Sequence, residues 1–250
     1  MIGAKSIREM AKVSGLRPWQ QEKHYLQSVL LSSLSDLPLV FKGGTYLWFF
    51  HGLNRFSEDL NFTITGNIKK DLPEFVSKSL NLYGFSNKLK NIKNEETGIS
   101  ARFMINGPLN TSQSDSCVIY VEASGRETIL LPKIPLKLDF PQYDLPIKNL
   151  LGMNLDEVGA EKVRAILTRK KARDIFDLYY LIGRKNIKFD VDLINQKISV
   201  NRLIFNKSLF LTNLKEREES FSREMKQIVL GELPPFEEVF KRISIWVNFR

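Results

Sequence analysis

Two acidic positions and one amide are spaced so that they could bind a divalent metal ion. Asp59 and Asn61 flank Leu60 in a strictly alternating segment, so on a strand their side chains share one face. Asp139 follows a second alternating segment and would share a face with Lys137. Carboxylate and amide oxygens are ligands that hard cations such as Mg²⁺ take in proteins. The pattern therefore predicts a metal site built on two strands.

A glycine pair upstream could bind phosphate. The apolar run Leu39–Phe41 predicts a short buried strand, and Gly43 and Gly44 follow as a tight turn before an apolar helix. Backbone N–H groups at such a turn and at the start of a helix can receive phosphate oxygens. The chain runs 15 residues from Gly44 to Asp59, which is enough for a short helix and a return into an adjacent strand.

The remaining periodicity predicts an α+β fold, with a small mixed sheet flanked by helices and a helical C-terminal portion. Pro18 opens a helix with apolar residues at three- and four-residue steps, and Asn154 with Glu157 predicts a capping box at the start of another. The expected helices span 18 to about 38, 68–83, 154 to about 170 and 172–182, and the expected antiparallel strands 85–92, 99–105, 116–121 and 128–131. The composition shift predicts an α+β core with N-terminal helices over 1–149 and a helical portion over 150–250.

The composition limits the chemistry that the chain can carry. Its 250 residues include one cysteine, Cys117, and two histidines, which excludes an intramolecular disulfide and a usual Cys/His zinc site. No apolar run approaches the roughly 18 residues that a membrane helix needs. The N-terminal segment carries alternating charges in place of an apolar signal sequence. We therefore expect a cytoplasmic protein without membrane contact.

The charge balance favours an anionic partner. The chain has 37 basic and 28 acidic side chains, a formal net charge of +9. A basic run is usually a solvated helix end, but it can also bind the phosphates of a polynucleotide. One run comprises Arg164, Arg169, Lys170, Lys171 and Arg173. A second basic region comprises Lys69, Lys70, Lys78, Lys88, Lys90 and Lys93.

Five motifs, in this order, resemble those of the AbiEii/AbiGii-type nucleotidyltransferase toxins, a family of the polymerase-beta-like nucleotidyltransferase superfamily. They are FKGGT at 41–45, RFSEDLNF at 55–62, LKLD at 136–139, AEK at 160–162 and RDIFDLY at 173–179. The segment PWQQEKHY at 18–25 also resembles the N-terminal region of the family. The resemblance extends from about residue 16 to about residue 183 and leaves the last third of the chain without a motif.

The resemblance implies a nucleotidyltransferase-like fold and roles for individual residues. It implies Mg²⁺ or Mn²⁺ as the cofactor, with Asp59, Asn61 and Asp139 as the metal ligands and Asp59, Asp139 and Lys162 as the catalytic residues. The implied nucleotide-binding residues are Gly43, Gly44, Thr45, Arg55, Ser57, Lys162 and Asp177. The helical C-terminal portion would close the nucleotide cleft.

The resemblance also implies a function. The chain would be the toxin of a toxin–antitoxin or phage-defence system that moves a nucleotide from a nucleoside triphosphate to an RNA acceptor. The acceptor end of transfer RNA is a candidate, with the run from Arg164 to Arg173 as its binding site. A separate antitoxin protein would be the partner.

Asn61 departs from the family pattern, which has an aspartate there. An amide oxygen can bind a metal but brings no negative charge, so we expect either weakened activity or a catalytically inactive nucleotide- or RNA-binding module. Transfer to a protein or small-molecule hydroxyl is a further alternative. The residues alone also allow simpler readings, in which the glycines only form a turn, the polar strand faces are solvated, and the stem of Lys162 packs while its ammonium reaches water.

Overall fold

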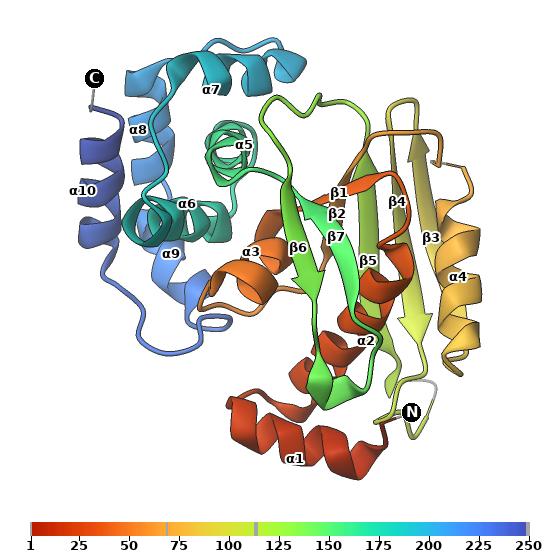
Figure 1. The fold of residues 1–250 in the computed structure, drawn as a ribbon. Helices are drawn as coiled ribbons and strands as arrows, with labels where there is room; N and C mark the ends of the chain where they lie inside the picture. Colours follow the sequence, from red (N-terminus) through yellow and green to blue (C-terminus); the bar gives the residue numbers. More distant parts are fainter. Residues whose placement is uncertain (1, 69, 113–114, 249–250) are drawn as a thin grey trace. The chain divides into compact units, whose positions relative to one another are not determined.

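Two compact units make up the chain in the computed structural model, which describes residues 2–68, 70–112 and 115–248 (Figure 1). The first unit comprises Met1–Tyr46, Glu58–Arg126 and Ile134–Gly152. The second comprises Leu47–Ser57, Glu127–Lys133 and Met153–Arg250. The division into domains at residue 149 stays a prediction. Lys69, one residue of the second basic region, lies outside the described residues.

A seven-stranded mixed sheet is the centre of the first unit. Its strands are β1 (Leu39–Lys42), β2 (Leu60–Ile64), β3 (Asn87–Glu95), β4 (Gly98–Ile105), β5 (Cys117–Ser124), β6 (Ile134–Leu138) and β7 (Lys148–Gly152). They lie in the order β3-β4-β5-β2-β1-β7-β6 (Figure 1). The pairs β2–β5 and β1–β7 are parallel, and the other neighbours are antiparallel. The predicted fold class, a mixed sheet with helices and a helical C-terminal portion, is confirmed.

The first unit also contains the helices α1 (Ala4–Ser14), α2 (Pro18–Leu34), α4 (Leu72–Leu82) and the short 3₁₀ helix η2 (Pro141–Tyr143). α2 and α4 lie against the sheet, and α1 packs against α2. α2 packs against β5 and α4 against β3, and Figure 1 shows α4 beside β3. On β4 the alternating residues Ile99, Ala101 and Phe103 are buried, whereas Arg102 is exposed. This strict alternation is typical of a sheet with one face in the core and one in solvent.

The expected strand–turn–helix–strand unit is present at the centre of the sheet. All four residues of β1 are buried, and the chain turns at Gly43 into α3 (Gly43–His51). It then returns as β2, antiparallel to β1, with Lys42 opposite Asn61. The register places the start of α3 beside the start of β2, as the short spacing predicted.

The second unit is helical. It contains α5 (Leu155–Thr168), α6 (Ala172–Lys185), α7 (Val191–Ile198), the 3₁₀ helix η3 (Ser199–Asn201), α8 (Lys207–Lys215), α9 (Glu218–Met225) and α10 (Phe236–Trp246). α5 packs against α6, α7 and α8, and α6 packs against α9 and α10. The expected helices over 154–170 and 172–182 correspond to α5 and α6. Among the described helices, none has the length and apolar character that crossing a membrane requires.

Two local predictions are wrong in this region. The expected strand over 128–131 is absent, and the N–H groups of Leu130 and Leu131 instead donate to the carboxylate of Glu157, each at 3.0 Å. Glu157 therefore does not complete a capping box. Asn154 caps α5 by itself, because its side-chain oxygen accepts the N–H of Asp156 at 3.0 Å. The partner of Glu157 is distant in sequence, so local spacing could not identify it.

Gly152 gives a test of the packing between β7 and α3. A Cβ atom there would lie 2.6 Å from Cε2 of Tyr46 and 2.9 Å from Cδ1 of Leu136, both buried side chains. We expect Gly152→Ala to lower the free energy of unfolding by about 1–3 kcal/mol, because the core must expand. Urea unfolding followed by circular dichroism measures this loss.

Gly183→Ala is the matched control. The three atoms nearest its new Cβ belong to the side chain of Arg242, whose flexible end can move aside at the cost of its contacts with Tyr179 and Glu238. Alanine is favoured over glycine in a helix by up to about 1 kcal/mol. We expect this change to lower stability less than Gly152→Ala does. Equal effects of the two substitutions would contradict the packing described for Gly152.

Candidate active site

Gly43 shapes the first group of predicted site residues, all of which lie in the first unit. Its φ of +83° is one that L side chains rarely adopt, and a Cβ atom there would lie 3.2 Å from Cβ of Asn61. Both the turn and the close approach therefore require glycine. Gly44 and Thr45 continue into the first turn of α3 and are buried.

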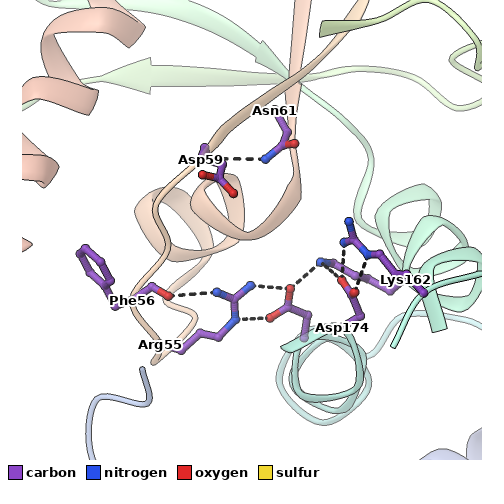
Figure 2. Close-up of polar contacts among 8 residues, drawn as sticks. Arg55, Phe56, Asp59, Asn61, Lys162 and Asp174 are labelled. Carbon is purple, nitrogen blue, oxygen red and sulfur yellow. Dashed lines mark hydrogen bonds and ion pairs between the residues drawn. The ribbon is translucent and has the colours of Figure 1, made fainter. Parts of the chain in front are cut away.

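Asp59 and Asn61 are held by the start of α3. The buried hydroxyl of Thr45 donates to the backbone carbonyl of Asp59 at 2.7 Å, and Nδ2 of Asn61 lies 3.5 Å from the same oxygen (Figure 2). Both site side chains are half-buried. The hydroxyl of Thr45, a residue predicted to bind triphosphate, thus fixes the strand that carries two of the predicted metal ligands.

Glu122 is a candidate ligand that the sequence did not reveal. β5 runs parallel to β2 with Glu122 opposite Asn61, so the two side chains share one face of the sheet. Glu122 is exposed, and the hydroxyl of Ser100 on β4 donates to its Oε1 at 3.4 Å. The alternation around Glu122 predicted a strand, but only the register shows which strand it neighbours.

Asp139 lies away from this group, so the strand register does not support the prediction that it is the third metal ligand. Leu138, the last residue of β6, pairs with Lys148 at the start of β7, whereas Gly152 at the end of β7 pairs with Phe41. Measured along the direction of the strands, Asp139 and Asn61 are therefore separated by about 16 Å or more. Asp139 is exposed and forms an ion pair with Lys137 at 2.6 Å.

The oxygen donors of Asp59, Asn61 and Glu122 fit a hard divalent cation. Asp59 offers a carboxylate, Asn61 an amide oxygen and Glu122 a second carboxylate, all from adjacent strands. Such donors suit Mg²⁺ or Mn²⁺ and do not suit soft metals. Among the residues that the structure describes, there is no group of three or more His, Cys, Asp or Glu side chains arranged to hold a metal.

The second group of predicted site residues lies in the second unit. Arg55 donates from Nε and Nη2 to the two carboxylate oxygens of Asp177, at 2.6 and 2.7 Å (Figure 2). Its Nη1 also donates to the carbonyl of Phe56 at 3.0 Å. The side chains of Arg55 and Asp177 are both buried. Ser57, two residues after Arg55, is also buried. A buried bidentate pair of this kind fixes both partners.

Lys162 extends this pair into a network of alternating charge. Its ammonium forms ion pairs with Asp177 at 2.5 Å and with Asp174 at 3.0 Å. Arg169 donates to both oxygens of Asp174, at 2.8 and 2.9 Å. The order is thus Arg55, Asp177, Lys162, Asp174 and Arg169.

The cations of this network keep its two carboxyls ionised. Burial by itself raises the pKa of Asp177, but Arg55 and Lys162 outweigh it and hold that pKa below its usual value. Burial likewise opposes ionisation of Asp174, but Lys162 and Arg169 outweigh it and hold the pKa of that carboxyl well below its usual value.

The predicted RNA-binding run consists of residues in different environments. Arg164 forms an ion pair with the buried carboxylate of Glu127, and Arg169 binds Asp174. Lys170 and Lys171 are exposed, and Arg173 is half-buried. Part of the positive charge of this run is therefore neutralised within the second unit.

Comparisons with known proteins agree with the fold and the motifs. A family model described as the nucleotidyl transferase AbiEii toxin of a type IV toxin–antitoxin system matches residues 24–242. A search of curated proteins gives no match.

Three solved structures are similar in fold. MenT4, a nucleotidyltransferase toxin from Mycobacterium tuberculosis H37Rv, aligns with a TM-score of 0.64 at 18% identity over 99% of this chain and 89% of that chain. JHP933 from Helicobacter pylori aligns with a TM-score of 0.57 at 20% identity, over 92% of this chain and 90% of that chain. A structure from H. pylori described as a putative nucleotidyltransferase aligns with a TM-score of 0.59 at 21% identity, over 90% of this chain and 92% of that chain. Because the family model covers most of the sequence, the chain belongs to the AbiEii family of nucleotidyltransferase toxins of type IV toxin–antitoxin systems.

Proposed function

We propose that this nucleotidyltransferase moves a nucleotide from a nucleoside triphosphate to an RNA acceptor, with the acceptor end of transfer RNA as a candidate. The observation that supports this most is the close packing of the glycine turn and the first turn of α3 against Asp59 and Asn61, with Glu122 opposite Asn61 in the strand register. The family implies an antitoxin as the protein partner of the toxin. We propose the cytoplasm as its location.

Gly43, Gly44 and Thr45 would bind the triphosphate. They form the first turn of α3, where backbone N–H groups have no partner within the helix and the helix dipole favours negative charge. The close approach of Gly43 to Asn61 brings these N–H groups next to the candidate metal ligands. Phosphate oxygens bound here would therefore lie beside Asp59 and Asn61.

Asp59, Asn61 and Glu122 would hold the divalent metal. A bound Mg²⁺ or Mn²⁺ supplies charge neutralisation for the triphosphate during an in-line displacement. The two carboxylates give the ion negative charge on either side of the neutral amide. Glu122 takes the place that the sequence assigned to Asp139.

Asn61 would weaken this site without abolishing it. Its Nδ2 points to the carbonyl of Asp59, which leaves the side-chain oxygen as the metal donor. An aspartate at the same position would place a second carboxylate beside Asp59, and only a bound cation would relieve that repulsion. Asparagine thus holds the metal-free strand without strain but attracts the ion less.

Lys162 would contact the phosphates, and Asp177 and Arg55 would position it. Its ammonium is shared by Asp174 and Asp177, so a phosphate must compete with two carboxylates for it. Arg55 and Arg169 hold these carboxylates from their other sides. This arrangement keeps a charged lysine stable inside the second unit.

A catalytically inactive nucleotide- or RNA-binding module is the second candidate function. The neutral amide at position 61 is the observation that favours it, because one formal charge of the family pattern is missing. Protein hydroxyls and small-molecule hydroxyls are alternative acceptors.

A transfer assay separates these functions. The protein is incubated with labelled nucleoside triphosphates, Mg²⁺ or Mn²⁺, and RNA, protein or aminoglycoside acceptors. We expect label in RNA, about 100-fold less with Asp59→Ala because a metal carboxylate is lost, and more than wild type with Asn61→Asp.

Asp139→Ala is the matched control for Asp59→Ala and should leave transfer unchanged. Glu122→Gln should lower transfer, whereas Glu9→Gln on the exposed side of α1 should not. Label no greater in wild type than in Asp59→Ala, with no gain in Asn61→Asp, would favour the binding module.

The charge network gives a second test, based on stability and pH. Asp177→Asn leaves Arg55 and Lys162 buried without their shared carboxylate, which costs about 3–5 kcal/mol at pH 7. Because the folded pKa of Asp177 is lowered, its contribution is present above about pH 4 and is lost as the pH falls through that lowered value. The difference between wild type and Asp177→Asn should therefore shrink below about pH 4. Urea unfolding from pH 7 to pH 3 measures it.

Lys162→Met is the control for this test. It retains the Arg55–Asp177 and Arg169–Asp174 pairs, so its loss of stability should be smaller, while loss of the phosphate contact should lower transfer. A stability of Asp177→Asn equal to that of wild type at pH 7 would contradict the network.

A further inference from the structure

The face of β3, β4 and β5 that α2 and α4 leave uncovered is exposed and basic. On β4 the buried residues Ile99, Ala101 and Phe103 alternate with Ser100, Arg102 and Met104, which are exposed or half-buried. Because side chains alternate strictly along a strand, the second set forms the opposite face of the sheet. We call this surface the open sheet face and define it by Lys88, Lys93, Ser100, Arg102, Met104, Tyr120 and Glu122.

The register joins these residues into rows across the strands. Lys93 lies opposite Ser100, and Ser100 lies opposite Glu122. Glu122 in turn lies opposite Asn61 on β2. This row reaches from β3 to the candidate metal ligands over three strand spacings, about 14 Å.

A second row of the open sheet face combines a cation with an aromatic ring. Arg102 lies opposite Tyr120, and its guanidinium carbon is 5.6 Å from the centre of the tyrosine ring. Tyr120 is half-buried, so part of its ring remains accessible. Exposed aromatic rings on a sheet, beside Arg and Lys, stack nucleic-acid bases and bind the phosphates.

In the part of the chain that the structure describes, the three cations of this face form no ion pairs, although the carboxylate of Glu122 lies on the same face. Across the described residues, no carboxylate forms an ion pair with Lys88, Lys93 or Arg102, and Lys90 in the register shift of β3 is likewise exposed. By contrast, Lys78 on α4 binds Glu74. Arg164 and Arg169 of the predicted RNA-binding run are also paired with carboxylates.

We infer that the open sheet face binds the single-stranded end of the RNA acceptor. Its phosphates contact Lys88, Lys93 and Arg102, and a base stacks on Tyr120. These contacts direct the RNA strand across the sheet towards Glu122 and Asn61. The identity of the acceptor rests on the proposed function, whereas the binding surface rests on the register and the exposure of these side chains.

Direct RNA binding tests the surface separately from catalysis. The full chain, without nucleotide or metal, is titrated into a fluorescein-labelled single-stranded RNA 12-mer, and anisotropy gives Kd between 0.05 and 0.3 M salt. We expect Lys93→Gln with Arg102→Gln to weaken binding at least about fivefold and to reduce the slope of log Kd against log salt by about 1.4, because two phosphate contacts are lost.

Two further variants distinguish this surface from a general charge effect. Lys5→Gln with Lys12→Gln removes the same charge from the exposed side of α1 and should leave Kd within twofold. Tyr120→Leu should weaken binding about fivefold or more through lost stacking while the salt slope stays unchanged. Circular dichroism melts of each variant show that the fold is retained.

The surface is contradicted if Lys93→Gln with Arg102→Gln binds RNA as wild type does, or if the α1 variant loses as much affinity. Wild type that binds no RNA at 0.05 M salt also contradicts it and favours an acidic protein as the ligand of this face. Label transfer to RNA by a variant whose binding is unchanged would reject the surface and leave the proposed function intact. Binding through this face without label transfer to RNA would support the surface and reject the RNA acceptor.

Discussion

The hydrogen bond that Thr45 donates to the carbonyl of Asp59 fixes the arrangement on which the candidate metal site depends. It joins the first turn of α3 to the residue that precedes β2, across a separation of 14 residues. Thr45 is fully buried, and the turn at Gly43 connects it to the buried strand β1. The position of Asp59 and Asn61 is therefore fixed by the core, so as candidate metal ligands they would need little rearrangement.

The two groups of predicted site residues differ in the burial and in the pairing of their charges. In the first unit, Asp59, Asn61 and Glu122 are half-buried or exposed oxygen donors that gain from a bound cation. In the second unit, Lys162, Arg55 and the two carboxylates are buried and Arg169 is exposed, and the three cations alternate with the two carboxylates so that each charge has a partner. Such a buried network is held together by its own ion pairs and is costly to break at any one carboxylate.

Local pattern predicted much of this architecture. The strand, glycine turn and helix around Gly43 could be recognised because each depends on neighbours in sequence, and so could the cap at Asn154. The distance between Asp139 and Asn61 could not be predicted, because it depends on the pairing of β6, β7 and β1. Glu122 was missed for the same reason, since parallel pairing with β2 is a long-range property. The partners of Glu157 lie about 26 residues away, and no spacing rule identifies them.

The most direct test of the central claim is the position of the metal. Crystals grown with Mn²⁺ and a non-hydrolysable nucleoside triphosphate would give an anomalous difference map at the manganese edge. The account predicts a peak bounded by oxygens of Asp59, Asn61 and Glu122, with triphosphate oxygens at the start of α3. A peak beside Asp139, or ordered triphosphate without a peak at Asp59, would contradict it.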